Sequence, residues 1–255
     1  MSLTTYTILG LPVAATTYRE SFEQASLWAR DATSGVRLVE AANTHVVALA
    51  RHEPAFREVM AHFDLVLPDG MPLVWVLNRR HGARLKDRVY GPTLMARSFE
   101  WSQENEHTHI RHFLLGSTPD TLEKLEANLR RDYPKANLVG VHSPPFRNWD
   151  EADRRALIEA IDSSGANFVW TCFGCPKQET ILAEMKEQLP QAVYFGIGAA
   201  FAFHAGVVKQ APAWIQRLGM EWCFRLLSEP RRLFKRYLVN NTRFIWYLLW
   251  DHPSQ

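Results

Sequence analysis

Residues 65–75 read LVLPDGMPLVW, and this stretch carries the pattern that decides the fold. A short apolar run of the strand type ends at Pro68, and the Asp69–Gly70 turn leads directly into the next helix. Gly70 lets the backbone approach a ligand closely, and a carboxylate at a strand end can serve as a general base for a hydroxyl nucleophile. The alternative is that Asp69 only caps the following helix, because Asp-Gly is a very common turn.

Short strand-type runs alternate with helical stretches along most of the chain. In one amphipathic stretch Leu122, Leu125 and Leu129 share a face, as in a half-buried helix. The alternation predicts right-handed crossovers and a Rossmann-like α/β fold, with a mostly parallel sheet and helices on both faces. In such sheets the ligand lies beyond the carboxyl ends of the strands. The predicted strands span residues 36–41, 64–68, 112–116, 137–141, 168–173 and 192–198, and the predicted helices include 118–133, 150–164 and 176–189.

The composition argues against several classes of protein. The 255 residues are 47% apolar and 22% charged, enough for a full core, and the net charge of +2 argues against general nucleic-acid binding. The sequence contains no G-x-x-x-x-G-K-[ST] loop for nucleotide hydrolysis. Three cysteines are typical of a reducing compartment, and the first residues lack the basic region of a signal peptide. Since no run approaches the roughly 20 apolar residues of a spanning helix, we expect a cytoplasmic location.

Two later turns carry candidate binding residues. Gly116, with the Ser and Thr after it, joins a strand to a helix in a geometry that suits phosphate at a helix N-terminus. Ordinary capping by Ser or Thr explains these residues equally well. Gly198 is a second candidate, in the segment FGIGAAF, but Phe201 stands where a dinucleotide fingerprint requires its third glycine. A nicotinamide-dependent dehydrogenase is therefore disfavoured.

The turn FGCPKQE is the most unusual one. Cys172 and Cys175 form one C-x-x-C pair, without the second pair that a zinc site would need, and packing is a better explanation for them than redox chemistry. Gln178 and Glu179 open a helix, where an amide can offer donors and acceptors to sugar hydroxyls or phosphate oxygens. The ten histidines show no H-x-x-x-H spacing, so the sequence offers no visible metal-ligand set.

Taken together, the motifs resemble those of the WecG/TagA/CpsF glycosyltransferases, which extend lipid-linked saccharides in bacterial surface-polymer synthesis. The resemblance covers nearly the whole chain and implies an inverting, metal-independent and cofactor-free transfer from a UDP-sugar to an undecaprenyl-diphosphate-linked saccharide. The transferred sugar, of the hexose or the N-acetylmannosamine type, is left open. The motifs are, in order, AANTHVV, LVLPDGMPLVW, RVYGP, FLLGS, FGCPKQE, GIGAAF, HAGVVKQAPAW and GMEWCFRLLSEPRRLFKRY.

The resemblance also implies roles for individual residues. Asp69 would be the general base that deprotonates the acceptor hydroxyl. Asn43 and Arg88 would line the donor and acceptor pocket, and Gln178 would contact the substrate. A guanidinium suits phosphate through its forked donors. The tail would reach over the pocket toward the diphosphate with Arg225, Arg232 and either Lys235 or Arg236.

Three positions depart from the family pattern. Ala202 stands where the family usually has Asp in AAFDF, Thr93 replaces a common Asp after YGP, and Ala41 replaces a Thr two residues before the strand-end Asn43. These departures leave open a change of specificity, an engineered substitution, or a catalytically impaired or non-catalytic protein that binds lipid-linked sugars.

The composition changes near residue 210, which predicts a catalytic core of residues 1–209 and a helical appendage of residues 210–255. From Ala205 onward eight Lys and Arg stand against three acids, so this end is locally basic. Pro230 is expected to divide it into two helices. Their aromatic and basic residues suit the headgroup layer of an anionic membrane, which predicts a peripheral protein on the cytoplasmic face. The alternative is a helix pair that packs on the core or within a homo-oligomer.

Overall fold

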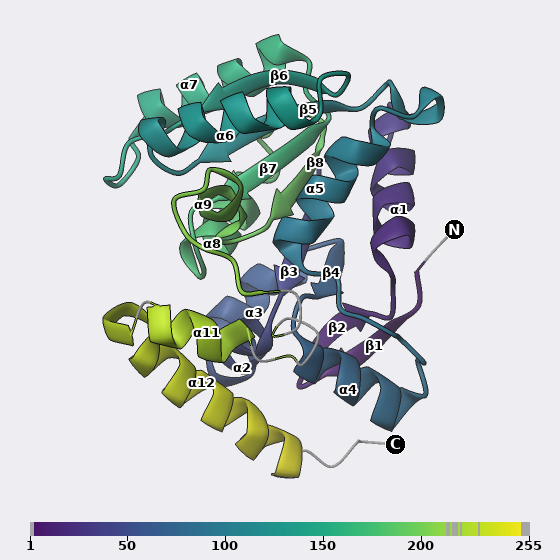
Figure 1. Cartoon of the computed structure of the whole chain (residues 1–255), viewed down its shortest axis with the longest axis vertical. Helices are drawn as coiled ribbons and strands as arrows, with labels where there is room; N and C mark the ends of the chain where they lie inside the picture. The colour runs from purple at the N-terminus through teal and green to yellow at the C-terminus, as the bar shows by residue number, and fades with distance from the viewer. Residues whose placement is uncertain (1–2, 213–214, 216–218, 220, 229, 251–255) are drawn as a thin grey trace.

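The predicted strand segments form one sheet in the computed structural model of the chain (Figure 1). The structure describes residues 3–212, 215, 219, 221–228 and 230–250, with the backbone alone for 221, 228 and 230–238. Within these residues the strand order is β1-β2-β4-β3-β8-β7-β5-β6, and every neighbouring pair is parallel except β1 with β2. The strands are β1 (Thr5–Ile8), β2 (Leu11–Ala14), β3 (Arg37–Ala42), β4 (Leu65–Pro68), β5 (Arg111–Gly116), β6 (Asn137–His142), β7 (Phe168–Cys172) and β8 (Val193–Gly196). The predicted mostly parallel α/β sheet is confirmed.

Helices cover both faces of the sheet because each one carries an apolar stripe that it buries against the strands. Leu122, Leu125 and Leu129, predicted to share a buried face, are each at most 3% exposed. One layer contains α2 (Thr44–His52), α3 (Pro54–Ala61), α4 (Met71–His81), α7 (Glu151–Ser164) and α8 (Lys177–Met185). The other contains α1 (Tyr18–Arg30), α5 (Gly91–Trp101), α6 (Pro119–Asp132) and α9 (Ala200–His204). A 3₁₀ turn, η1 (Asn105–His107), leads from α5 to β5.

The antiparallel hairpin of β1 and β2 was not among the predicted strands. Its turn consists of Leu9 and Gly10, with φ values of 50° and 93°. Positive φ at both central residues gives a turn whose twist matches that of the flanking strands. Val13 of β2 then pairs with Val66 of β4, so the hairpin extends the sheet beyond its parallel part. β4 is equally short but consists of four buried residues, whereas β1 exposes two threonines and β2 contains Pro12, so neither hairpin strand shows the continuous apolar run of a central strand.

Two helices close the described chain, as predicted. They are α11 (Glu221–Ser228) and α12 (Pro230–Trp250). Pro230 is the first residue of α12, the helical position where proline is best tolerated because the N–H it lacks has no partner there anyway.

The helix α12 packs along α2 on the core. Phe244 is 3% exposed and belongs to the same apolar cluster as the α2 side chains. The Thr44 hydroxyl donates a hydrogen bond to Oδ1 of Asn241 at 2.8 Å, and Nδ1 of His52 lies 3.0 Å from the Tyr247 hydroxyl. The helix α12 is therefore attached to α2, in the N-terminal half of the chain, while the division into residues 1–209 and 210–255 stays a prediction.

Candidate functional site

The carboxyl ends of β3 and β4 bring two predicted site residues together. Asn43 directly follows β3 and Asp69 directly follows β4, and these two strands are parallel neighbours. The backbone N–H of Asp69 donates to the carbonyl of Ala42 at 2.9 Å, which ties the two strand ends to each other. A Cβ built on Gly70 would lie 3.9 Å from Cβ of Asn43, so the two turns are in contact.

A cavity of about 780 Å³ opens at this edge of the sheet. Its floor comes from the turns after β3 and β4, and its walls come from α4, from the segment around Arg88, and from α11 and α12. Its size falls within the range of small-molecule sites. The described lining residues are Asn43, Thr44, Asp69, Gly70, Met71, Pro72, Trp75, Val76, Arg79, Arg80, Arg88, Tyr90, Gly219, Trp222, Arg225, Leu226, Asn241, Thr242, Phe244, Ile245 and Leu248.

Asp69 is the one acidic side chain among these described lining residues. The N-cap of α4 is Gly70, and this helix start carries no side-chain cap hydrogen bond. Asp69 therefore precedes the N-cap residue of α4, and its side chain lines the cavity.

Arg88 reaches the same cavity from the segment between α4 and α5. Its side chain is only 9% exposed and lies over the Tyr90 ring, with Cζ 4.1 Å from the ring centroid. The backbone N–H of Tyr90 donates at 3.1 Å to the Tyr18 hydroxyl, whose pKa is raised mainly by burial. This packing holds the guanidinium in a fixed position at the cavity wall.

The two polar atoms of the Asn43 side-chain amide have different roles. Its Oδ1 accepts from the backbone N–H of His45 at 3.0 Å and of Val46 at 3.4 Å, so the carbonyl oxygen caps α2. The Nδ2 group is then the part of the side chain that can donate to a ligand.

Gln178 and Glu179 lie outside the cavity lining. They are 1% and 0% exposed, and Nε2 of Gln178 donates to Oε2 of Glu40 at 3.1 Å. Burial and the neighbouring Glu179, to which it is hydrogen-bonded, raise the pKa of Glu40 well above its ordinary value. A Cβ on Gly196 would come within 2.0 Å of the Glu40 carboxylate, so the cluster is closely packed beneath the strand ends. Contact of Gln178 or Glu179 with substrate stays a prediction.

Gly116 and Gly198 also lie outside the cavity lining. Gly116 has φ 107°, and a Cβ there would come 2.6 Å from the Cys172 carbonyl oxygen, so the close approach of two strands requires glycine. Gly198 has φ 57°, with open space where a Cβ would stand. The Cys172 thiol donates to the Gly198 carbonyl at 2.8 Å, and burial raises its pKa to about 12. That value favours packing over redox chemistry for this cysteine.

Of the predicted tail residues, Arg225 lines the cavity, with Cζ 5.5 Å from the Phe203 ring centroid. The side chains of Arg232, Lys235 and Arg236 lie outside the described part of the structure.

Sequence reasoning missed the α4 side chains that line the cavity. Trp75, Arg79 and Arg80 line it together with Pro72 and Val76. Their spacing of three and four residues marks one face of the helix, which is the signal that could have identified them.

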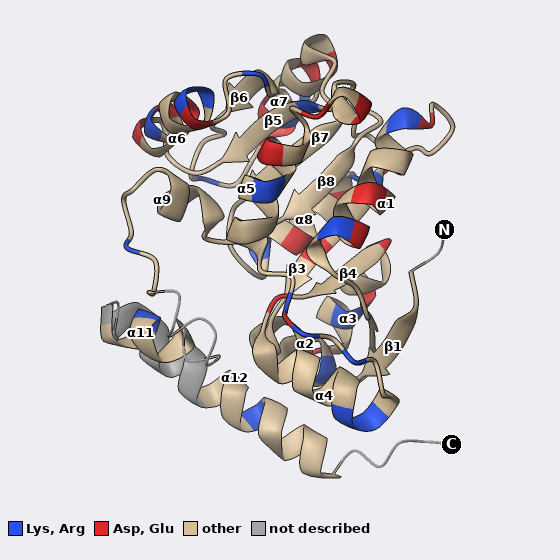
Figure 2. Ribbon diagram, turned by 45° about the vertical axis from the view of Figure 1, so that its right-hand side comes forward, with Lys and Arg blue, Asp and Glu red and all other residues tan. Residues whose placement is uncertain are grey.

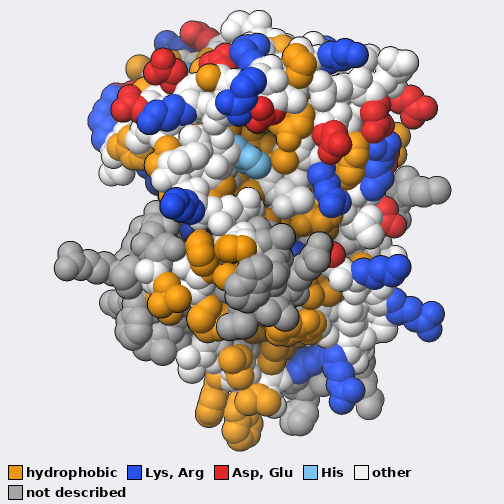
Figure 3. Space-filling view, viewed as in Figure 1, with side chains coloured by type: hydrophobic (Ala, Val, Ile, Leu, Met, Phe, Trp, Pro, Cys, Tyr) orange, Lys and Arg blue, Asp and Glu red, His pale blue; other side chains and the backbone are white. Residues whose placement is uncertain are grey.

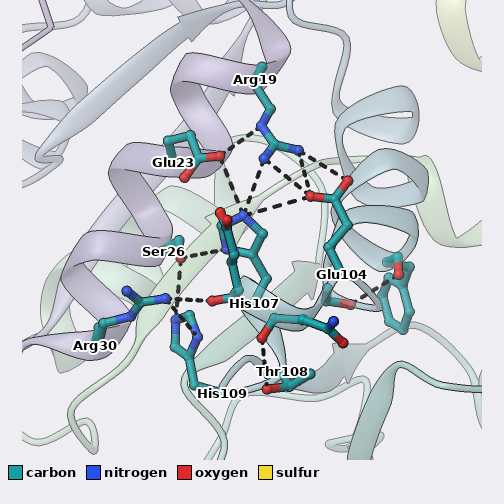
Figure 4. Close-up of polar contacts among 12 residues, drawn as sticks. Arg19, Glu23, Ser26, Arg30, Glu104, His107, Thr108 and His109 are labelled. Atoms are coloured by element: carbon teal, nitrogen blue, oxygen red, sulfur yellow. Dashed lines mark hydrogen bonds and ion pairs between the residues drawn. The ribbon is translucent and has the colours of Figure 1, made fainter.

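A second polar cluster lies away from the cavity, between α1 and the segment before β5 (Figure 4). The Ser26 hydroxyl lies 3.2 Å from Nδ1 of His107, and Nε2 of His107 lies 3.4 Å from a Glu23 oxygen. A serine, a histidine and a carboxylate therefore contact one another in a row. Ser26 and His107 are each 3% exposed. A nucleophile buried within a helix cannot meet a substrate, and the cluster serves to join α1 to η1.

Two properties of the described chain bear on metal and membrane. No three His, Cys, Asp or Glu side chains gather in the described residues in a way that could hold a metal ion. In the same residues, no helix combines the length and apolar character needed to cross a membrane.

The sequence of the chain matches the Glycosyl transferase WecG/TagA/CpsF family over residues 6–255. The match includes the turns that carry Asn43 and Asp69 as well as α11 and α12, which form the outer wall of the cavity. The chain thus belongs to the WecG/TagA/CpsF family of glycosyltransferases.

Proposed function

We propose that this protein transfers a sugar from a UDP-sugar to a hydroxyl of an undecaprenyl-diphosphate-linked saccharide, with inversion and without a metal ion. Family membership gives the coarser statement, a glycosyltransferase with a sugar-nucleotide donor and a lipid-linked acceptor. The reaction would take place on the cytoplasmic face of the membrane, during synthesis of a bacterial surface polymer.

The observation that carries the proposal is the charge pattern of the cavity. Asp69 is the single carboxylate of the described lining, and Arg88 and Arg225 face the same space. A direct displacement with inversion needs one base and a place for the leaving diphosphate. One acid among arginines offers both.

The proposed chemistry follows from these groups. Asp69 takes the proton of the acceptor hydroxyl while that oxygen attacks the anomeric carbon of the donor. The bond between this carbon and the UDP oxygen breaks, and the electron pair leaves with UDP. Arg88 and Arg225 neutralise the charge that develops on the diphosphate, a role for which forked guanidinium donors are well suited.

The location at a membrane is supported by the apolar surface beside the cavity. Trp246, Leu249 and Trp250 of α12 are 58%, 73% and 66% exposed. Figure 3 shows hydrophobic side chains projecting from the lower end of the molecule, where Figure 1 places the end of α12. A contiguous exposed apolar patch on a helix suits the interfacial layer of a bilayer.

The departures from the family pattern do not fall in the cavity. Ala202 and Thr93 are both absent from its described lining. The Ala202 carbonyl accepts from the backbone N–H groups of Val207 and Val208, both at 3.0 Å, and so organises the chain after α9. This favours an active enzyme over a sugar-binding protein that has lost catalysis.

The first test is calorimetric titration of the full chain with UDP in EDTA, with ADP as the control. Micromolar binding selective for UDP would support the donor and metal independence. Absence of binding, also with anionic vesicles present, would overturn the proposal. A panel of UDP-hexoses and UDP-N-acetylmannosamine, with an undecaprenyl-diphosphate-linked saccharide as acceptor, would then identify the donor.

A further inference from the structure

The cavity is bounded by one face of α4 and one face of α12. The α4 side chains that line it recur every three or four residues from Met71 to Arg80, and those of α12 recur in the same way from Asn241 to Leu248. Nη2 of Arg80 donates to the Leu248 carbonyl at 2.5 Å, so the ends of the two helices are joined. The space between them is an elongated trough that starts at Asp69.

The chemical character of the trough changes along α4. Asp69 stands just before the helix, Trp75 comes one turn in and is 54% exposed, and Arg79 and Arg80 lie in the last turn. At 1.5 Å per residue, Arg79 lies about 12 Å along the helix from Met71. A base, an aromatic surface and a pair of cations therefore follow one another at the scale of a sugar joined to a diphosphate.

The two arginines are available for an anion. Arg79 has no ion pair or hydrogen bond among the described residues, and Arg80 uses one nitrogen for the Leu248 carbonyl and keeps further donors. Figure 2 shows basic positions gathered at the end of α4. Cations in a last turn also complement the helix dipole, but that effect does not require them to line the same cavity as the base.

The surface beyond the arginines is apolar. The end of α12, which Arg80 contacts, exposes Leu249 and Trp250. A ligand that passes the arginines therefore meets hydrocarbon-like side chains at the rim of the trough.

We infer that Arg79 and Arg80 bind the diphosphate of the acceptor, with the acceptor sugar over Trp75 and the first isoprenoid units against the end of α12. This inference rests on the proposed function and adds a second pair of diphosphate-binding arginines to Arg88 and Arg225. The trough then selects the acceptor by length, because the acceptor hydroxyl reaches Asp69 only when the sugar spans the distance between Asp69 and the two arginines. The ligand class is an isoprenoid diphosphate.

The test is a direct binding measurement, independent of sugar transfer. The full chain is titrated calorimetrically with farnesyl diphosphate, and farnesol and inorganic pyrophosphate serve as probes for each half of the ligand. The wild-type protein should bind farnesyl diphosphate at least tenfold more tightly than either half. R79Q and R80Q should each weaken this binding about tenfold, as expected for the loss of one charge-assisted hydrogen bond. Neither substitution should change the affinity for farnesol.

The matched control is R84Q, which removes one charge from an exposed position just after α4, outside the cavity lining. It should bind like the wild type. Equal weakening by R79Q and R84Q, or unchanged binding by R79Q, would overturn the inference. R79Q should fold normally because Arg79 has no hydrogen bond or ion pair among the described residues. The test by R79Q therefore stays valid even if R80Q, which loses the Arg80–Leu248 hydrogen bond, loosens α12. Failure of the proposed function would appear separately, as absent UDP binding in a protein that still binds farnesyl diphosphate.

Discussion

Gln178 donates a hydrogen bond from Nε2 to Oε2 of Glu40 at 3.1 Å, and this bond joins the first turn of α8 to β3, the strand that ends just before Asn43. Both side chains are at most 2% exposed. Glu179 completes the cluster through its hydrogen bond to Glu40, and two carboxyl groups that share a buried site cannot both ionise without a large cost. Beneath the cavity floor, the cluster supports the strand ends.

We expect Glu40→Gln to stabilise the protein increasingly as the pH rises. The folded-state pKa of Glu40 is raised by burial and by Glu179, so its contribution is fully present below the unfolded pKa and is lost as pH rises through the folded value. The neutral amide removes this loss. Urea unfolding at pH 5.5 and pH 8 measures it, with Glu58→Gln, an exposed acid on α3, as the control. An equal stability change at both pH values would contradict the prediction.

Asp69→Asn should abolish sugar transfer while UDP binding is retained. Loss of a general base lowers the rate by about 10²- to 10⁴-fold, and the isosteric amide keeps the shape of the turn. The measurement is transfer rate and UDP affinity on the same preparation. Asp87→Asn, which neutralises an exposed acid outside the cavity lining, should keep most of the activity. Full activity of Asp69→Asn would remove the base from the mechanism.

Phe244→Ala should release α12 from the core. Truncating a buried Phe typically costs about 3–5 kcal/mol, and here the lost contacts are those that hold α12 against α2. We expect faster proteolysis within α12 and weaker farnesyl diphosphate binding, with little change in the melting temperature of the sheet. Ile245→Ala is the neighbouring control for proteolysis alone, since Ile245 is 58% exposed and also lines the cavity. Identical proteolysis of the two variants would argue against this anchoring role.

His112 should make the protein less stable as the pH falls below 6.5. Its Nδ1 accepts from Nε1 of Trp170 at 3.1 Å, so the neutral ring carries its proton on Nε2, which faces the Ser102 hydroxyl at 2.9 Å. Burial lowers its pKa to about 3. In this pH range His112 is protonated in the unfolded chain but not in the folded chain. The free energy of unfolding therefore falls by about 1.4 kcal/mol for each pH unit between pH 6.5 and about 3.

The comparison is the slope of unfolding free energy against pH for wild type and His112→Phe. The variant should lack this part of the slope, whatever its absolute stability. Parallel slopes would show that His112 titrates normally.

Replacing Trp246 and Trp250 together by Ser should weaken binding to vesicles that contain anionic lipid by at least about tenfold, because each aromatic ring contributes apolar area at the interface. Flotation or co-sedimentation measures the effect. Phe146→Ser is the control, a 76% exposed aromatic residue remote from α12 in the sequence. An equal loss of vesicle binding in both variants would indicate non-specific hydrophobic adsorption instead of a docking face on α12.

The sequence was most informative where local pattern and topology coincide. Asn43, Asp69 and Arg88 follow turns or short segments at the carboxyl edge of the sheet, and the structure brings them into one cavity. Gln178 also follows such a turn, but the direction of its side chain depends on how α8 crosses the sheet, which a motif does not contain. The hairpin at Leu9 was missed because its strands lack the continuous apolar run that marks the equally short β4.

The far wall of the cavity was hidden for a different reason. Trp75 and Arg79 share a helix face that reads as an ordinary amphipathic stripe, and only its pairing with α12 turns that stripe into a binding surface. The partner lies about 170 residues later in the chain, a separation that periodicity within one window cannot bridge.

The contact between α2 and α12 also fixes when the enzyme can become active during its synthesis. Thr44 and Asn241 are 197 positions apart. At about 5–20 residues per second, roughly 10–40 s separate their emergence from the ribosome. Until then the nascent chain has Asp69 but lacks the α12 residues that line the same cavity. Premature termination before α12 therefore leaves a product that carries Asp69 but lacks the α12 wall of the cavity.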